Sequence, residues 1–218
     1  MYLSRLILNP RNRRVQREVA DPYQMHRSIM RAFPDDLDDQ TERVLFRLEP
    51  HPHAGTPSLL VQSLTHPDWA WLAEPGARGY LLPVDAPNPA IKSFDLSLVP
   101  GQALAFRLRA NPTVKRRFKD GQHKRVGIYR EEEQIKWLER KAGWGGFHLI
   151  SVNTHRQETV GGRIRRDGAT HKLRLLSIQF DGLLQVTDPE RLRQAVRQGI
   201  GSGKGLGFGL LSLAPAFN

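Results

Sequence analysis

Apolar and polar residues follow one another along the first half of the chain in short runs, which predict strands and amphipathic helices. Asp21 is a favourable N-cap and Pro22 suits the first helical position, so a helix is expected over residues 21–33. A second, shorter helix is expected over residues 67–76, which end in a Pro-Gly stop. The basic segment 10–20 is interpreted as a loop. Strands are expected over residues 1–9, 43–50, 58–64 and 91–99.

The second half repeats this order of elements. Helices are expected over residues 131–142, whose first turn carries three glutamates, and over 188–200, which start at a capping Asp. Two successive β-α-β-β-α-β units predict an α+β fold of two tandem ferredoxin-like (RRM-like) domains with antiparallel sheets. The Val-Pro-Gly-Gln break predicts domains of residues 1–99 and 100–218. Strands are expected over residues 102–111, 147–153, 171–188 and 207–215.

The charge balance of the 218 residues indicates what the protein binds. Lysine and arginine number 33 against 22 aspartate and glutamate residues, which gives a net charge of +11 and a pI of about 10.5. A domain this basic usually binds a polyanion, and nucleic acid is favoured over a membrane because no strongly apolar amphipathic helix accompanies the charge. The alternative is a generally solubilising surface. Cysteine is absent, which fits a reducing cytoplasm and excludes a disulfide scaffold.

Basic residues gather in three runs that lie between the predicted helices and strands. Such runs on one chain predict a groove that binds a nucleic-acid backbone with salt-sensitive affinity. The third run is expected on a long hairpin that could rest against a structured RNA, and the aromatic signature of RRM sheets is missing. The runs comprise Arg11, Arg13, Arg14 and Arg17; Lys115, Arg116, Arg117, Lys119, Lys124 and Arg125; and Arg156, Arg163, Arg165, Arg166, Lys172 and Arg174.

The helix expected over residues 21–33 carries a candidate for chemistry beside its apolar stripe. At 100° per residue, Met25 and Ile29 belong to the stripe and His26 lies at its edge. Tyr23 is an i,i+3 neighbour of His26 on a partly exposed face, so both side chains could address one ligand atom. The alternative is that His26 is a packed, hydrogen-bonded histidine, and the helix by itself leaves both interpretations open.

The glycine-rich segment 199–209 lacks the known nucleotide-binding patterns. A Walker A loop needs glycine where Gln198 stands, and the third glycine of GxGxxG is never in place. Backbone packing against RNA and a tight crossover between helix and strand remain equal alternatives. A metal site is not expected, because His51 and His53 stand together without a carboxylate at a recognisable spacing.

Five stretches of the sequence together resemble one known family. The stretches MYLSRLILNP, PYQMHRSIMRAFP, FRLRANPT, EEEQIKWLERKAG and QGIGSGKGLGFGLLSLAP are similar to the CasE-type CRISPR repeat endoribonucleases (RAMP superfamily) of the type I-E surveillance complex, Cascade. The resemblance covers nearly the whole chain and implies the tandem ferredoxin-like fold. It also implies a cytoplasmic enzyme of antiviral defence that binds the CRISPR repeat stem-loop in precursor RNA and assembles with other Cascade subunits.

The resemblance also implies where the chemistry takes place. The family's Tyr-x-x-His context falls on Tyr23 and His26, which would cut RNA at the 3′ base of the stem without metal or cofactor. The RNA's own 2′-OH attacks, which leaves a 2′,3′-cyclic phosphate and a 5′-OH. Gly203 and Gly205 lie outside the family pattern. RNA-binding residues are expected at Arg27, Arg31, Lys115, Arg116, Arg156, Arg163, Arg165, Arg166, Lys172, Lys204, Gly201 and Gly207.

Two other functions are compatible with the same residues. A non-catalytic subunit of the complex would bind the RNA hairpin and never cut it. A metal-dependent nuclease would lose its activity with a chelator, and the poor inventory of ligand residues argues against it.

Overall fold

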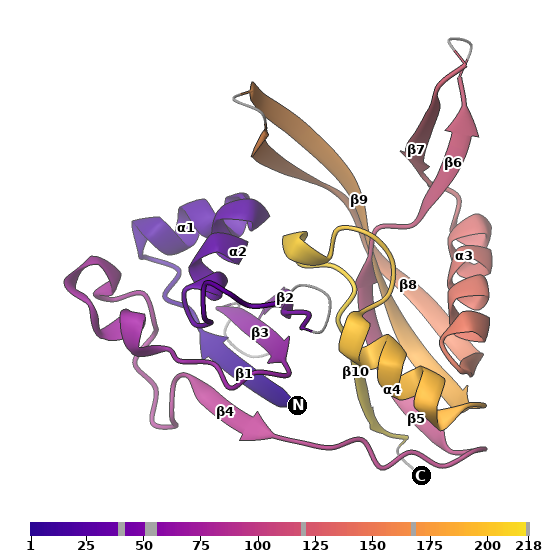
Figure 1. The fold of residues 1–218 in the computed structure, drawn as a ribbon, viewed down its shortest axis with the longest axis horizontal. Helices are drawn as coiled ribbons and strands as arrows, with labels where there is room; N and C mark the ends of the chain where they lie inside the picture. The colour runs from indigo at the N-terminus through magenta and orange to yellow at the C-terminus, as the bar shows by residue number, and fades with distance from the viewer. Residues whose placement is uncertain (39–41, 51–55, 119–120, 167–168, 217–218) are drawn as a thin grey trace. The chain divides into compact units, whose positions relative to one another are not determined.

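The computed structural model describes residues 1–38, 42–50, 56–118, 121–166 and 169–216 (Figure 1). The described residues form two compact units. The first unit consists of residues 1–95, 161–173 and 205–207, and the second of residues 96–160, 174–204 and 208–218. The domain boundary predicted between residues 99 and 100 remains a prediction.

The first unit contains an antiparallel sheet with strand order β2-β3-β1-β4 (Figure 1). Numbered along the chain, this is the 2-3-1-4 order of a ferredoxin-like domain, as predicted. Its elements are β1 (Tyr2–Ile7), α1 (Arg13–Ala20), α2 (Pro22–Met30), β2 (Leu45–Pro50), β3 (Pro57–Ser63), the 3₁₀ turns η1 (Ala70–Ala73) and η2 (Pro75–Ala77), and β4 (Ala90–Ser93).

Two predictions for this unit were wrong. The segment 10–20, predicted as a loop, contains helix α1, because the Asn12 side chain accepts hydrogen bonds from the backbone N–H groups of Arg14 and Val15. The helix predicted over residues 67–76 is replaced by the short turns η1 and η2, because proline at position 75 ends the run after one turn.

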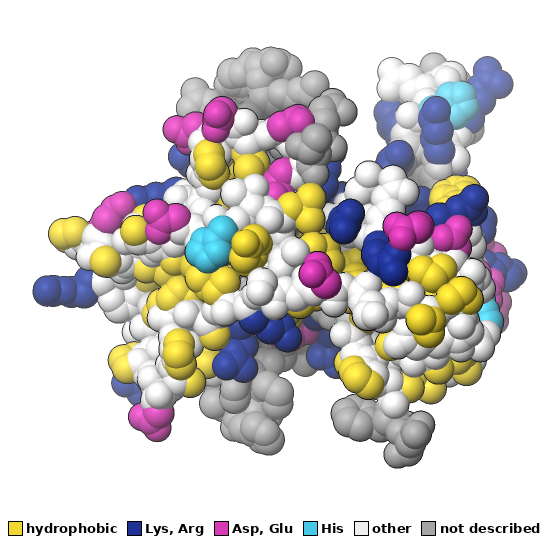
Figure 2. All heavy atoms as spheres, turned by 60° about the horizontal axis from the view of Figure 1, so that its bottom comes forward, with side chains coloured by type: hydrophobic (Ala, Val, Ile, Leu, Met, Phe, Trp, Pro, Cys, Tyr) yellow, Lys and Arg dark blue, Asp and Glu magenta, His cyan; other side chains and the backbone are white. Residues whose placement is uncertain are grey.

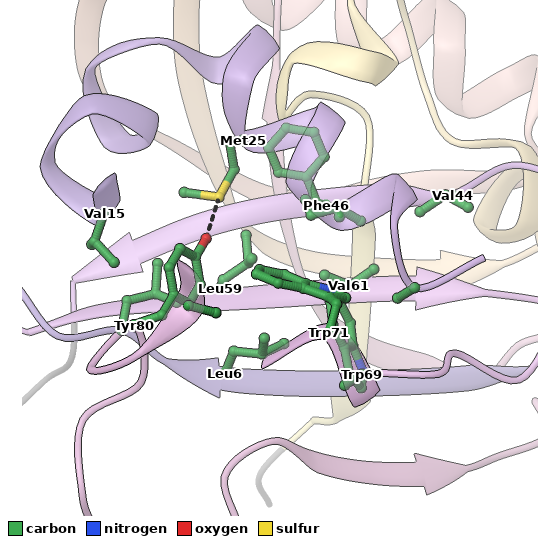
Figure 3. Packing of buried hydrophobic residues seen from close by; sticks show 14 of the residues in the cluster. Leu6, Val15, Met25, Val44, Phe46, Leu59, Val61, Trp69, Trp71 and Tyr80 are labelled. Atoms are coloured by element: carbon green, nitrogen blue, oxygen red, sulfur yellow. Dashed lines mark hydrogen bonds between the residues drawn. The ribbon is translucent and has the colours of Figure 1, made fainter. Parts of the chain in front are cut away.

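The core of the first unit lies between one face of the sheet and helices α1 and α2. Val15 from α1 and Met25 from α2 pack against Leu59, Val61 and other buried side chains of the sheet (Figure 3). The hydroxyl group of Tyr80 points to the sulfur atom of Met25 at 3.7 Å (Figure 3). This packing fixes the orientation of α2, because its apolar stripe can face the sheet in one way only.

The second unit has the same strand arrangement with an inserted hairpin. The sheet order is β10-β5-β9-β8, which again is the ferredoxin-like order, and β6 pairs with β7 in a separate two-stranded sheet. The elements are β5 (Ala103–Ala110), β6 (Thr113–Arg117), β7 (His123–Gly127), α3 (Glu131–Trp144), β8 (Phe147–Arg166), β9 (Ala169–Val186), α4 (Pro189–Gln198), η3 (Lys204–Leu206) and β10 (Leu211–Pro215).

The second basic run was expected to lie between the predicted helices and strands, but its residues fall largely in the β6–β7 hairpin. Its register places Lys115 opposite Arg125 and Arg116 opposite Lys124. Like charges that face each other across two strands destabilise the pairing. The segment also lacks the alternation of apolar and polar residues that would indicate strands in the sequence. Lysine and arginine side chains gather on the surface of this hairpin (Figure 2, upper right).

Candidate functional site

Helix α2 carries the predicted catalytic pair and begins as the sequence indicates. The Asp21 carboxylate accepts a 3.1 Å hydrogen bond from the backbone N–H of Tyr23, and Pro22 occupies the first turn. Met25 and Ile29 are almost fully buried, whereas Tyr23 and His26 are half-buried. The helix therefore presents Tyr23 and His26 beside its core stripe, as its periodicity predicts.

The imidazole of His26 is in contact with an aromatic side chain from the sheet. Its ring stacks with the ring of Phe46 on β2, with the centroids 6.3 Å apart and the planes inclined by 16°. Phe46 is 2% exposed and belongs to the core, so its ring is held in place by the surrounding packing. Nδ1 of His26 is buried.

A segment distant in sequence also reaches this histidine within the first unit. A Cβ atom added to Gly205 would lie 3.6 Å from Nε2 of His26 and 3.7 Å from Cδ2 and Cε1. These nearly equal distances place Gly205 over the face of the imidazole. Gly207 has a φ of +82°, and a Cβ atom there would lie 3.1 Å from the Phe46 ring. The glycines thus allow the backbone to approach both rings closely.

A buried carboxylate joins α1 to α2 and so positions the helix that carries Tyr23 and His26. Glu18 is 5% exposed and accepts hydrogen bonds from Nε of Arg14 at 2.7 Å, Oγ of Ser28 at 2.6 Å and the hydroxyl of Tyr80 at 2.5 Å. A buried charge is tolerated when it is paired and fully hydrogen-bonded, as here. Burial, followed by the charge of Glu18, raises the pKa of Tyr80 far above its ordinary value.

Of the two arginines predicted on this helix, Arg27 lies on the solvent side of α2 and Arg31 lies at its C-terminal end. Arg27 is exposed, and Arg31 follows one turn later as the C-cap residue. Arg31 donates hydrogen bonds to both carboxylate oxygens of Glu74, at 2.7 and 2.8 Å, and its guanidinium carbon lies 4.8 Å from the centre of the Trp71 ring. The structure therefore brings Arg27 and Arg31 onto the helix that carries Tyr23 and His26.

Other predicted RNA-binding residues belong to the second unit. Lys115 and Arg116 are exposed on strand β6, and Lys204 directly precedes Gly205 in the chain. Gly201 has a φ of +87°, and a Cβ atom there would lie 3.1 Å from the ring of Trp137. This glycine is explained by close packing against α3.

For the arginine-rich hairpin formed by β8 and β9, the structure describes the backbone. The backbones of Arg156, Arg163, Arg165 and Arg166 lie in β8 and that of Lys172 lies in β9, whereas their side chains lie outside the described residues. Strand β8 is longer than predicted, because it continues through the Gly- and Arg-rich connection to Arg166.

The described residues contain no cluster of three or more His, Cys, Asp or Glu side chains that could hold a metal ion. His51 and His53 lie outside the described residues. Among the helices that the structure describes, none has the length and apolar character needed to cross a bilayer.

Several residues around the predicted pair were missed by the sequence analysis. Phe46 stacks on His26 and Gly205 lies where a side chain would meet it, but they are 20 and 179 positions away along the chain (46 − 26 and 205 − 26), so no local pattern links them to it. Glu18 and Tyr80 form their hydrogen bond across 62 positions. The capping residue Asn12 and the spacing of Arg14 and Glu18, four residues apart, are local signals that could have indicated a helix there.

Comparisons with known proteins show to which family the chain belongs. The chain is 42% identical to the CRISPR-associated endoribonuclease Cse3 of Thermus thermophilus, over 99% of this chain and 100% of the relative. It is 32% identical to the CRISPR system Cascade subunit CasE of Escherichia coli, with the same coverage. A structure of Thermus thermophilus Cse3 bound to an RNA representing a pre-cleavage complex covers 98% of both chains at 39% identity, with a TM-score of 0.79. A protein-family model described as CRISPR associated protein matches residues 1–215, and the chain belongs to this family.

Proposed function

We propose that this protein is an endoribonuclease that cleaves CRISPR precursor RNA at the 3′ base of the repeat stem-loop and keeps the product bound. The observation that carries the proposal is the environment of His26, whose ring is stacked on Phe46 and faces the bare backbone of Gly205, with Tyr23 one turn away. Its two relatives are named as an endoribonuclease and as a Cascade subunit, which supports both the activity and assembly with Cascade subunits.

The proposed reaction is an internal transfer within the RNA. The 2′-oxygen next to the scissile phosphate forms a bond to phosphorus and loses its proton, and the bond from phosphorus to the 5′-oxygen breaks. The leaving 5′-oxygen takes up a proton, so no water or oxidant is consumed. The products are a 2′,3′-cyclic phosphate and a 5′-OH.

Tyr23 and His26 are the groups proposed to move these protons. A histidine side chain exchanges protons near neutral pH, and a positioned general acid or base accelerates a reaction by roughly 10²–10⁴-fold. The tyrosine hydroxyl can hydrogen-bond the phosphate or the attacking oxygen. Arg27 and Arg31 are proposed to offset the negative charge that develops on phosphorus, because guanidinium groups bind phosphate oxygens in a bidentate manner. This mechanism requires no metal ion.

The remaining basic surfaces are proposed to hold the stem-loop. Lys115 and Arg116 lie on the β6–β7 hairpin, where repulsion between facing cations is relieved by a bound polyanion. Lys204, Gly201 and Gly207 are proposed to contact RNA through the glycine-rich segment. The set is completed by the cations of β8 and β9, namely Arg156, Arg163, Arg165, Arg166 and Lys172. Domains of residues 1–99 and 100–218 and a cytoplasmic location, suggested by the cysteine-free sequence, belong to the same proposal.

The decisive experiment is cleavage of a labelled repeat hairpin by the purified protein in excess EDTA. We expect a single cut with a cyclic-phosphate end, and loss of cutting with retained binding for His26→Ala. The matched control is His148→Ala, which removes an exposed histidine from β8 and should cut normally. If the wild type binds the hairpin and never cuts, the protein is a non-catalytic hairpin-binding subunit. If EDTA abolishes cutting, the reaction depends on a metal ion.

A further inference from the structure

Strand β8 forms an outer edge of the second unit's sheet and keeps backbone groups that no described residue binds. The strand order β10-β5-β9-β8 gives β8 one neighbour, β9 (Figure 1). Outside this pairing, the structure records no hydrogen bond between the backbone of residues 148–153 and another described residue. An edge strand directs alternate N–H and C=O groups away from the sheet, so these groups can pair with a further strand.

The side chains of β8 show the same openness. Leu149 and Val152 are half-buried, and Ile150 is 50% exposed. On the neighbouring strand β9, by contrast, Phe180 and Leu184 are fully buried. The partial exposure of three apolar side chains indicates that the described part of the chain does not pack along the outer side of β8.

The composition of β8 differs from that of the other edge strands. Natural edge strands resist unwanted pairing through short length, charged side chains or proline. Strand β2 carries Arg47 and Glu49, β4 has four residues and carries Lys92, and β10 ends at Pro215. Strand β8 has 20 residues, and its first nine, FHLISVNTH, contain no charged residue, no proline and no glycine. This part of β8 is therefore suited to accept a further strand.

Positive charge flanks the uncharged stretch at both ends. Arg140 and Lys141 precede it near the end of α3, and Arg156 follows it in the sequence. If a second copy of the chain paired with β8 in antiparallel register about the middle of the stretch, cations would meet cations at both ends. These like charges and the net charge of +11 on each copy oppose such a dimer. A partner strand with acidic residues at its ends is favoured instead.

An exposed tryptophan stands next to the start of the strand. Trp144 is 70% exposed near the end of α3, and Lys141 Nζ lies 4.6 Å from the centre of its ring. The indole is three residues before Phe147, so their Cα atoms are at most about 11 Å apart. Tryptophan is among the residues that contribute most to protein–protein binding. A segment that pairs with β8 and continues past Phe147 reaches this ring.

We infer that the outer edge of β8, over residues 148–153, binds an extended segment of another Cascade subunit, which joins the four-stranded sheet as a further strand. The inference rests on the proposed function, because it takes the partner from the proposed assembly with Cascade. Backbone hydrogen bonds hold the segment, Ile150 and Trp144 supply apolar contact, and the flanking cations select acidic residues at its ends. RNA is disfavoured, because the edge presents donors and acceptors in alternation and phosphate groups offer acceptors only.

The test measures the binding of labelled protein to Cascade assembled from its other subunits on a CRISPR RNA without the 3′ hairpin. The missing hairpin removes the tether through the stem-loop, so contacts with the protein subunits are measured. Ile150→Lys places a charge on the edge and should weaken binding roughly tenfold or more. Ile91→Lys is the matched control, because it makes the same change on β4 at a residue that is 40% exposed. It should bind like the wild type.

Hydrogen exchange then reports on the backbone pairing itself. On binding, the amides of residues 148–153 should exchange more slowly, whereas those of β4 should keep their rates. Asn153→Lys changes a second exposed position of β8 and should weaken binding as Ile150→Lys does. Urea denaturation shows whether each variant is folded, and Asn153→Lys decides if Ile150→Lys is not.

Three results would overturn the inference. The folded β8 variants would bind like the wild type, or residues 148–153 would exchange at the same rate in the complex, or the wild type would join Cascade through the hairpin alone. Loss of affinity for isolated hairpin RNA in the β8 variants would make RNA the occupant. Sedimentation of the wild type as a dimer, lost in Ile150→Lys, would make a second copy the occupant, and both results overturn the inference as well.

Failure of the proposed function is recognised separately. Cleavage of the repeat hairpin is measured in parallel, and Ile150→Lys should cut at the wild-type rate. A wild type that never cuts, yet binds the hairpin-free complex through β8, would contradict the proposed catalysis and support the inference. A wild type that cuts and joins Cascade, with β8 variants that bind equally well, would contradict the inference alone.

Discussion

The hydroxyl of Tyr80 donates a 2.5 Å hydrogen bond to Oε2 of Glu18, a carboxylate that is buried on α1, the helix that precedes α2. Through Glu18 and Ser28, this bond connects α1, α2 and the segment after the 3₁₀ turns. The position of α2 in the first unit thus depends on a polar group as well as on apolar packing.

Glu18→Ala should destabilise the protein strongly. Removal of one partner from a buried, hydrogen-bonded charge typically costs about 3–5 kcal/mol, because Arg14 and the hydroxyls of Ser28 and Tyr80 lose their acceptor. Urea denaturation followed by circular dichroism gives the free energy of unfolding. Glu133→Ala, which removes an exposed glutamate from a surface pair with Lys136, should change it by less than about 1 kcal/mol. Equal effects of the two substitutions would contradict the importance of burial.

Stability should fall at alkaline pH because of Tyr80. Its pKa is raised above the ordinary 10.0 in the folded protein, so above pH 10 the unfolded chain loses this proton while the folded protein keeps it. The contribution is fully present below pH 10, and the unfolding free energy then decreases by up to about 1.4 kcal/mol per pH unit as pH rises.

The check is the pH dependence of the urea midpoint between pH 8 and 11, for the wild type and for Tyr80→Phe. The variant should be less stable at pH 8 and should show a shallower alkaline decline. Parallel curves for the two proteins would show that the proton on Tyr80 is not responsible for the loss of stability at alkaline pH.

Gly205→Val should impair cleavage without unfolding the protein. Gly205 has no positive φ, and an added Cβ would make ordinary contacts at 3.6–3.7 Å with His26, so the backbone tolerates a side chain. The γ-carbons of valine would cover the imidazole and restrict its approach to RNA. We expect the single-turnover cleavage rate to fall about tenfold or more, because general acid–base catalysis by His26 would be partly lost.

Gly76→Val is the matched control, because nothing lies within 4 Å of a Cβ atom at that position. It should cleave at the wild-type rate. A wild-type rate for Gly205→Val as well would show that access to this face of His26 is unimportant. Gly207→Ala should behave differently and lose stability, because its positive φ and the 3.1 Å approach to Phe46 both oppose a side chain.

Glu74→Gln should increase the affinity for RNA. The Glu74 carboxylate competes with phosphate for Arg31, and an exposed pair of this kind is worth roughly 0.2–1 kcal/mol. Its removal should tighten binding by up to about fivefold at low salt, with a smaller gain at high salt. Glu190→Gln removes the same charge from the exposed pair with Arg193 on α4 and controls for net charge. Equal gains for both variants would point to net charge alone.

The sequence predicted those features that depend on local periodicity. The cap at Asp21, the stripe of Met25 and Ile29, and the edge position of His26 are all set by residues within α2. Helix α1 escaped detection because its surface is polar nearly all round, and its one buried carboxylate is stabilised by Tyr80, far along the chain. The β6–β7 strands escaped because an all-basic hairpin shows no alternation of apolar and polar residues.

The surroundings of His26 could not be predicted for a related reason. The ring contacts of Phe46 and Gly205 arise from tertiary packing, and neither residue stands out in a single sequence. The resemblance to known endoribonucleases indicated Tyr23 and His26 and left Gly205 outside its pattern. A side chain at Gly205 would meet His26, and the same kind of geometry shows that Gly201 packs on Trp137.

The cover over His26 has a consequence for the order of events during synthesis. Ribosomes add about 5–20 residues per second, so the 179 residues between His26 and Gly205 require roughly 10–35 s. Helix α2 leaves the ribosome long before the glycine that lies over its imidazole exists. For that interval a nascent chain carries the arginines of α1 and α2 beside an uncovered histidine. The placement of Gly205 beside His26 is therefore a late event in the synthesis of each molecule, and translation sets its time.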